Sequence, residues 1–220
     1  MFPINVSLLG RQVLMVGAGR VGRRKLEKLL RAGARVLVVE PRPDESVLNL
    51  AREGRVELKP HYRPELISGA SLVFAATSDP ALNRVVAEAA RARGVWVNVA
   101  DAPEMSDFAL PAVVERGDFN IAVTTGGGSP ALAACAAARL RDIFGPEYGL
   151  LAGIMARLRP KILASGLPIE AREKLFRKMA DSEELRARLA QGETEAARNL
   201  IRRLAAPVEV GDDWPVFEKK

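Results

Sequence analysis

A glycine motif between a predicted buried strand and a predicted helix constrains this fold more than any other feature. Residues 17–22 read Gly-Ala-Gly-Arg-Val-Gly and match the pattern GxGxxG. The apolar run at 12–16 predicts a strand before the motif, and the apolar spacing over 20–31 predicts a helix after it. The first glycine suits a tight turn, the second lets the backbone approach a pyrophosphate, and the third permits close helix–strand packing. This arrangement is typical of a dinucleotide-binding βαβ unit.

An acidic residue at the tip of the next predicted strand, over 35–39, bears on the choice of dinucleotide. Glu40 stands 18 residues after Gly22. A carboxylate there accepts hydrogen bonds from the ribose hydroxyls of NAD and repels the 2′-phosphate of NADP. Arg42, two positions further on, can neutralise such a phosphate. We expect NAD, and NADP stays open as the alternative.

Strands and helices alternate through the first hundred residues, and the pattern then changes. Alternation predicts right-handed crossovers and a mostly parallel sheet. Two strand-like runs at 108–114 and 119–125, joined by the polar stretch 115–118, predict a hairpin. Beyond Pro146 nearly everything is predicted helical, and the tail from Pro207 is expected to be partly disordered. The predicted class is α/β: a Rossmann-type doubly wound parallel sheet, a small α+β region and a helical C-terminal domain. The further predicted strands are 56–59, 71–75 and 95–99, and the further helices are 44–53 and 80–93.

Composition excludes several kinds of chemistry. One cysteine and one histidine among 220 residues exclude an internal disulfide framework, a Cys-rich zinc site and a cluster of imidazole ligands. The net charge of +6 favours an anionic partner, while the 5% aromatic content gives little support for nucleic-acid binding. The sequence has neither an apolar run long enough to span a membrane nor a signal-peptide pattern at its start. We expect a cytoplasmic protein that binds neither nucleic acid nor membrane.

Two further segments carry candidate site residues. Asp101 follows the strand predicted at 95–99, at the edge of the sheet that faces the ligand crevice in open α/β folds. A helix cap or turn former and a catalytic acid/base are both open for it. Residues 124–130 read Thr-Thr-Gly-Gly-Gly-Ser-Pro, in which Ser129 is a predicted helix N-cap. The free glycine amides predict either a nest for a carboxylate or phosphate or a flexible connector.

Other reactive or charged residues are given plainer interpretations. Cys135, on an alanine-rich helix, is predicted to be a small buried hydrophobe. His61 is predicted to lie on a loop, and a role in proton transfer stays open. The basic residues of the helix over 20–31, Lys25 among them, are interpreted as mostly a solvated face, with one or two in reach of an acidic substrate.

These motifs together resemble the precorrin-2 dehydrogenase/sirohydrochlorin ferrochelatase family, the siroheme synthase N-terminal type. The resemblance covers residues 1–145 and rests on four segments: 16–25, 75–77 (Ala-Ala-Thr), 98–101 (Asn-Val-Ala-Asp) and 126–132. The family usually carries Ala where Gly22 stands and Thr where Gly128 stands. The resemblance implies an NAD-binding Rossmann domain (1–113), a dimerisation region (114–145) and a helical C-terminal domain (146–220) in a homodimer.

The resemblance also implies an activity and a set of site residues. The activity is NAD-dependent oxidation of precorrin-2 to sirohydrochlorin, with Asp101 as catalytic acid/base. Insertion of ferrous or cobaltous ion, with Asp101 in transient contact with the metal, is left open by the sequence. The expected cofactor-binding residues are Gly17, Gly19, Arg20, Val21, Gly22, Glu40, Pro41, Arg42 and Thr77, and the expected substrate-binding residues are Asn98, Gly127, Gly128 and Ser129.

Two other functions compete with this one. A non-enzymatic NAD-sensing regulatory domain of an ion-transport system shares the βαβ start, and does not need Asp101 or the loop over 126–130. A small-molecule dehydrogenase with another acidic substrate usually includes a well-placed His or Lys, and His61 is poorly placed for that role.

Overall fold

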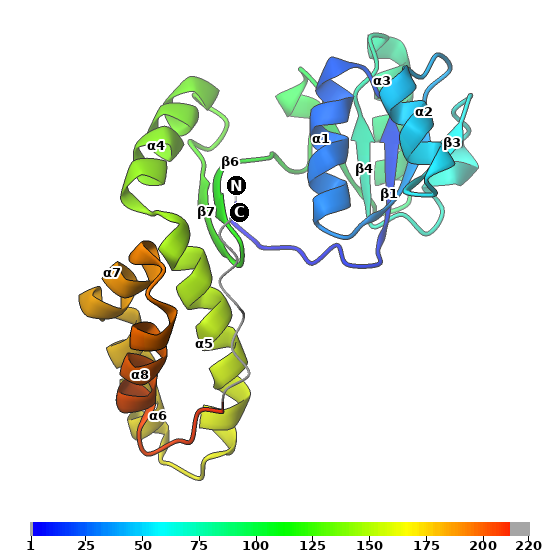
Figure 1. The fold of residues 1–220 in the computed structure, drawn as a ribbon. Coiled ribbons are helices and arrows are strands. Elements are labelled where there is room, and N and C mark those ends of the chain that lie inside the picture. The colour runs from blue at the N-terminus through cyan, green and yellow to red at the C-terminus, as the bar shows by residue number, and fades with distance from the viewer. Residues whose placement is uncertain (1, 212–220) are drawn as a thin grey trace. The chain divides into compact units, whose positions relative to one another are not determined.

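The computed structural model describes residues 2–211 and divides the chain into two compact units, Met1–Leu110 and Pro111–Lys220. The first unit holds a five-stranded sheet, and the second holds a two-stranded hairpin and five helices among its described residues. The predicted fold class is confirmed: a parallel Rossmann-like sheet is followed by an antiparallel hairpin and a helical region (Figure 1).

The sheet of the first unit is parallel throughout, in the order β3-β2-β1-β4-β5. Its strands are nearly continuous runs of Val, Leu, Met and Phe, which suits a sheet that is covered on both faces. The strand bounds are β1 (Gln12–Val16), β2 (Arg35–Val39), β3 (Val56–Lys59), β4 (Leu72–Ala75) and β5 (Trp96–Val99).

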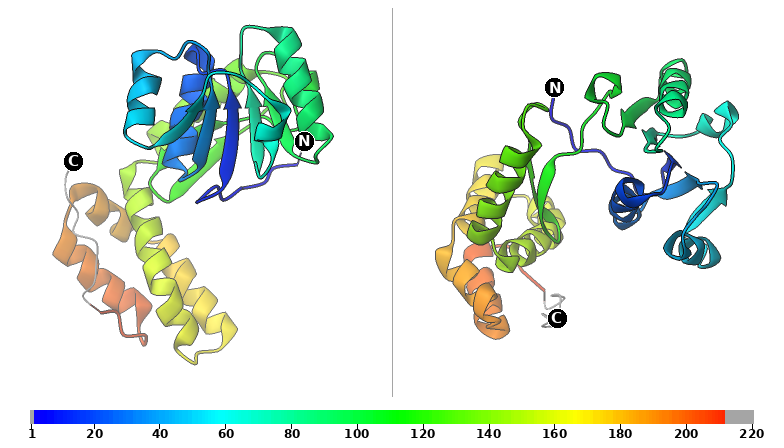
Figure 2. Two further views of the ribbon diagram at one scale, coloured as in Figure 1. Left: turned by 90° about the vertical axis from the view of Figure 1, so that its right-hand side faces the viewer. Right: turned by 90° about the horizontal axis from the view of Figure 1, so that it is seen from above.

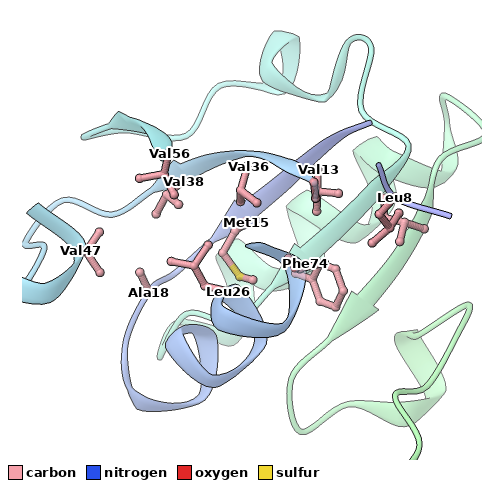
Figure 3. Packing of buried hydrophobic residues seen from close by; sticks show 13 residues of the cluster. Leu8, Val13, Met15, Ala18, Leu26, Val36, Val38, Val47, Val56 and Phe74 are labelled. Atoms are coloured by element: carbon pink, nitrogen blue, oxygen red, sulfur yellow. The ribbon is translucent and has the colours of Figure 1, made fainter. Parts of the chain in front are cut away.

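Helices cover the two faces of this sheet, and each face has its own core. Helices α1 (Arg20–Arg31) and α2 (Glu45–Arg52) pack on one face, where Met15, Leu26 and Phe74 lie together (Figure 3). Helix α3 (Pro80–Arg91) packs on the other face against the alternate side chains of the same strands. Figure 2 gives two further views of these helices about the sheet.

The carboxyl ends of three neighbouring strands lie level with one another. Val16 pairs with Ala75, and Ala75 pairs with Val99. The backbone continues this alignment past the strand ends, because Ala76 N donates to Val16 O at 2.7 Å and Ala100 N donates to Ala75 O at 2.8 Å. The segments that follow β1, β4 and β5 therefore start at one edge of the sheet.

Side chains close the outer edge of β5. Two short 3-10 turns, η1 (Pro64–Ile67) and η2 (Pro103–Met105), interrupt the loops of this unit. After η2 the chain returns along β5, where the Asp107 carboxylate accepts from Val97 N at 2.9 Å and the Ser106 hydroxyl accepts from Val99 N at 2.9 Å. These two side chains occupy backbone donors that a sixth strand would otherwise use.

The hairpin of the second unit differs from the predicted one. Its strands are β6 (Ala112–Arg116) and β7 (Phe119–Val123), so the polar loop expected at 115–118 shrinks to a two-residue turn. Gly117 takes φ +58°, which a tight hairpin turn requires, and Arg116 pairs with Phe119. Phe108, expected in the first of these strands, packs edge-to-face on Phe74 in the first unit, with ring centroids 5.4 Å apart.

An alanine-rich helix, α4 (Pro130–Ile143), follows the hairpin and shows a second difference. Cys135 is exposed, so the prediction of a buried cysteine is wrong. The helix buries only Ala133 and Ala137, which are four residues apart and share one face. Cys135 lies midway between them in sequence and therefore points away from that face.

Four helices complete the described part of the second unit: α5 (Pro146–Ala164), α6 (Ile169–Ala180), α7 (Glu183–Gln191) and α8 (Thr194–Ala205). They form one apolar core, with Ile154, Met179, Leu185 and Ile201 fully buried. Among residues 2–211, no helix is both long and apolar enough to cross a membrane. The expected irregular tail begins at Pro207, and all but its first five residues lie outside the described part of the chain.

Candidate functional site

The glycine loop after β1 packs tightly against the segment after β4. Gly17 has φ +94°, and a Cβ atom there would lie 2.5 Å from the carbonyl carbon and oxygen of Ala76. A Cβ atom on Gly22 would lie 2.3 Å from Gly17 O, so α1 begins in close contact with the turn. The first and third glycines are therefore fixed by the protein's own packing, as the motif predicts.

The second glycine of the motif faces open space. Gly19 is the N-cap of α1, with an extended backbone at φ −64° and ψ −170°. A Cβ atom there would meet no protein atom within 4 Å. The protein's packing therefore does not require a glycine at this position. A phosphate group approaching the first amides of α1 would require one, so the loop fits a dinucleotide pyrophosphate.

Glu40 stands at the end of β2 and contacts the glycine loop directly. Its Oε2 accepts from Ala18 N at 2.8 Å, and its Oε1 accepts from Arg42 N at 3.1 Å. The carboxylate thus connects the loop after β1 with the loop after β2. A carboxylate has about four lone-pair sites, so two remain for the hydroxyls of a ribose.

A buried asparagine supports the segment after β4. The Asn83 side chain, 5% exposed, accepts from Thr77 N at 3.1 Å and from the Thr77 hydroxyl at 2.8 Å, and donates to Thr77 O at 3.1 Å. These three bonds fix Thr77 beside Gly17. Asn83 was not among the residues predicted for the site, and its only signal in the sequence is a polar residue on the apolar side of a predicted helix.

Asp101 follows β5 at the same edge of the sheet and is exposed. It has φ +59°, and it is the only non-glycine residue between 2 and 211 with a positive φ. Aspartate and asparagine adopt the left-handed conformation more readily than other non-glycine residues, so the backbone strain at Asp101 is modest. Such local strain is concentrated at functional sites, where the surrounding structure holds the residue in place.

A lysine of α1 reaches toward the same strand end. The Lys25 ammonium donates to Asn98 Oδ1 at 2.6 Å and lies 5.6 Å from the centre of the Phe74 ring. Burial lowers the pKa of Lys25; the Asp101 carboxylate opposes this shift, and Arg24 adds to it. In the sequence Lys25 is one of several basic residues on the same helix, and nothing there distinguishes it from its neighbours.

Asn98 is held on both sides by the protein. The residue is 8% exposed, and its side-chain amide accepts from Lys25 and donates to Phe108 O at 2.8 Å. Its predicted role was a substrate contact. The structure gives both ends of the amide a protein partner, so Asn98 connects α1 with the chain beyond β5.

The loop at 126–129 belongs to the second unit. Gly126 and Gly127 have positive φ, and Ser129 caps α4 by accepting from Leu132 N at 3.2 Å, as predicted. Threonine side chains occupy part of the loop's amides: Gly126 N donates to the Thr124 hydroxyl, and Ser129 N donates to the Thr125 hydroxyl. Gly128 N donates to Thr125 O. The nest of free amides predicted from the sequence is therefore reduced by the two threonines that precede it.

The remaining candidates lie at or near the surface. Arg20, Pro41 and Arg42 are exposed, and Val21 is half-buried. His61 lies exposed on a loop, as predicted. Within the described residues 2–211 there is no group of three or more His, Cys, Asp and Glu side chains that could hold a metal ion. The first unit thus brings the glycine loop, Glu40, Thr77 and Asp101 to one edge of the sheet.

Comparison with known proteins finds one match to the first half of the chain and others to most of its length. Residues 4–112 match a family model described as "Putative NAD(P)-binding". Over the described fold, the solved structure of "SirC, precorrin-2 dehydrogenase" superimposes with a TM-score of 0.73 at 22% sequence identity, covering 93% of this chain and 98% of that one. This likeness supports the fold.

Curated relatives extend the match in sequence. A siroheme synthase of Chromobacterium violaceum is 36% identical over 206 residues, covering 93% of this chain and 44% of the relative. A siroheme synthase of Azotobacter vinelandii is 37% identical over 218 residues, covering 97% of this chain and 47% of the relative. The chain spans less than half the length of these relatives. The chain belongs to the siroheme synthase N-terminal family, with an NAD(P)-binding domain in its first half.

Proposed function

We propose that this chain is an NAD-dependent precorrin-2 dehydrogenase that oxidises precorrin-2 to sirohydrochlorin in siroheme biosynthesis. The observation that carries the proposal is the placement of Asp101, exposed and held at φ +59°, at the sheet edge where the glycine loop begins. The names of the relatives, siroheme synthase and precorrin-2 dehydrogenase, support the same reaction.

The cofactor is proposed to bind along the carboxyl edge of the sheet. The amides at the start of α1, beside the open position of Gly19, bind the pyrophosphate. Glu40 accepts hydrogen bonds from the adenine ribose and thereby selects NAD over NADP. When bound, NAD supplies the acceptor for the hydride that leaves the substrate. The full proposed set is Gly17, Gly19, Arg20, Val21, Gly22, Glu40, Pro41, Arg42 and Thr77.

Asp101 is proposed to act as the general base. Oxidation of precorrin-2 removes one hydride and one proton, and the proton needs an acceptor at the site. A positioned carboxylate contributes about 10²–10⁴-fold to such a step. The exposed Asp101 carboxylate can reach a bound substrate, and its fixed backbone turn limits the directions in which it points.

The substrate is a tetrapyrrole that carries many carboxylates. The net charge of +6 favours an anion of this kind. The proposed substrate-binding residues are Asn98, Gly127, Gly128 and Ser129. Of these, Ser129 retains its hydroxyl proton for donation, because its oxygen only accepts the cap bond from Leu132 N.

Incubation with precorrin-2 and NAD tests the proposed reaction. We expect NADH and the absorption spectrum of sirohydrochlorin to appear together. The Asp101→Asn variant keeps the size of the side chain and is expected to bind NAD normally while losing NADH production. A variant with full activity would eliminate Asp101 as the base. NAD binding without any oxidation by the unaltered chain would favour a regulatory NAD-sensing domain instead.

Metal insertion is a separate question that the same experiment answers. Ferrous or cobaltous ion, as a substrate, is added once sirohydrochlorin has formed. A spectrum of the metallated product above the non-enzymatic rate would add chelatase activity to the proposal. An unchanged rate would limit the chain to the dehydrogenase reaction.

We further propose that the chain works in the cytoplasm as a homodimer, with residues 114–145 as its dimerisation region. Leu132 and Ile143 of α4 are 61% and 64% exposed, and a second copy of the chain would cover this apolar surface. Light scattering coupled to size-exclusion chromatography measures the mass. A monomer at micromolar concentration would overturn this part of the proposal.

A further inference from the structure

The loop after β2 is bonded at both of its ends to the glycine loop and α1. At its first residue, Glu40 Oε2 accepts from Ala18 N at 2.8 Å. At its last residue, the Asp44 carboxylate accepts from the Arg23 guanidinium, which also donates to the Ser46 hydroxyl at 3.4 Å. Arg23 lies in the first turn of α1. The loop is therefore held against the segment that is proposed to bind the pyrophosphate.

The partner of Arg23 is itself fixed at the start of α2. Asp44 Oδ1 accepts from Val47 N at 3.1 Å, which caps the helix, and from the Ser46 hydroxyl at 2.6 Å. The other carboxylate oxygen, Oδ2, accepts from Arg23. The Ser46 hydroxyl, Val47 N and Arg23 all hold the pKa of the Asp44 carboxyl below its usual value. Arg23 is therefore paired with an anion whose position is set by the protein.

The stretch between these two fixed ends is short and stiff. It reads Pro41-Arg42-Pro43, and each proline restricts its own backbone. Arg42 N also donates to Glu40 Oε1 at 3.1 Å. Fixing the ends of such a loop fixes the residues between them, and Pro41 and Arg42 are among the residues proposed to lie along NAD.

We propose that Arg23 and Asp44 are positioning residues, which together hold the loop 40–44 in the form that binds the adenosine half of NAD. The inference rests on the proposed function, in which Glu40 accepts from the adenine ribose. Neither Arg23 nor Asp44 needs to touch the cofactor for this role. Without their ion pair, the loop would have to be ordered when NAD binds, and that ordering would cost affinity.

A double-mutant cycle tests the pair by calorimetry with NAD. Arg23→Gln removes the cation, and Asp44→Asn removes the anion while keeping a good helix cap. We expect each to raise Kd about three- to tenfold, the cost of ordering one or a few side chains. The double variant should be no weaker than the weaker single variant, because both break the same contact. Effects that multiply in the double variant would overturn the proposal.

Two variants on the same helix are the controls. Arg24→Gln removes an equal charge from the next residue, which is exposed, and should leave Kd unchanged. Arg23→Lys keeps a cation and should recover part of the affinity. A loss in Arg24→Gln as large as that in Arg23→Gln would mean that the general positive charge, and not the pair, favours the cofactor.

Fragments of the cofactor distinguish positioning from a merely structural role. ADP-ribose contains the adenosine half and should lose affinity in Arg23→Gln by the same factor as NAD. Nicotinamide mononucleotide lacks that half and should bind equally well to both proteins. The midpoint of urea unfolding should move little, because the two side chains are 40% and 46% exposed and such pairs contribute little to stability. Equal losses for both fragments would overturn the proposal.

Failure of this inference can be distinguished from failure of the proposed function. The cycle and the fragments measure binding alone, so an unaltered chain that binds NAD but does not oxidise precorrin-2 would overturn only the proposed reaction. Normal NAD affinity in Arg23→Gln would overturn only the role of the pair.

Discussion

Alanine in place of Gly17 or Gly19 should separate folding from cofactor binding within one loop. At Gly17 the new Cβ atom would lie 2.5 Å from Ala76 C and O and 2.6 Å from Thr77 N, all of them backbone atoms. The left-handed backbone costs about 1–2 kcal/mol and overpacking about 1–3 kcal/mol. We therefore expect Gly17→Ala to lower the free energy of unfolding of the first unit by about 2–5 kcal/mol.

Gly19→Ala should behave in the opposite way. Its backbone is compatible with alanine and no protein atom lies within 4 Å of the new methyl group. The free energy of unfolding should change by less than about 1 kcal/mol. The methyl group would occupy the space proposed for the pyrophosphate. We expect NAD affinity to fall at least about tenfold, equivalent to ~1.4 kcal/mol.

Both quantities can be measured on the same samples. Trp96, half-exposed on β5, reports on the first unit by fluorescence during urea unfolding, and Trp214→Phe removes the second tryptophan of the sequence. Isothermal titration calorimetry gives the NAD affinity. Equal destabilisation by the two substitutions, or unchanged NAD affinity in Gly19→Ala, would refute this account of the loop.

Three further outcomes are expected. Glu40→Ala should raise the affinity for NADP relative to NAD, measured by calorimetry; equal affinities in the unaltered chain would contradict the role of Glu40. The hydrogen bonds that the Asp44 carboxylate accepts from the Ser46 hydroxyl and Val47 N lower its pKa. Its stabilising effect is therefore complete above the ordinary aspartate pKa of about 4, and it is lost as the pH falls below that value and through the lowered pKa of the folded state. Asp44→Asn, an equally good cap, should therefore flatten the acid side of the stability curve; an unchanged curve would argue against it. Ser129→Ala should cost about 1 kcal/mol in unfolding free energy, and no loss in a urea titration would exclude the cap.

Most of the first unit could be predicted because its signals are local. Continuous apolar runs marked the strands, and the positions of Gly17 and Gly22 followed from the turn that the motif imposes. The first strand of the hairpin was misplaced by four residues because Phe108 is equally suited to a strand and to a core contact. The contact of Phe108 with Phe74 depends on tertiary packing, which the local sequence does not reveal.

Contacts in the candidate site between residues far apart in the sequence were harder to predict. Lys25 lies three residues after Gly22 and four before Leu29, both of which are buried. Its position on the buried face of α1 could therefore be predicted from the sequence. Its partner Asn98 is 73 residues away, and no periodicity predicts that pairing. Cys135 was misjudged because an alanine-rich helix gives no clear apolar face.

The closed rim of β5 limits how copies of this protein can associate. Val97 N and Val99 N already donate to the side chains of Asp107 and Ser106. A strand from another molecule therefore cannot accept hydrogen bonds from these two amides on that side of the sheet. Growth of the sheet from one molecule to the next, the first step of many aggregation routes, is thereby obstructed at this rim.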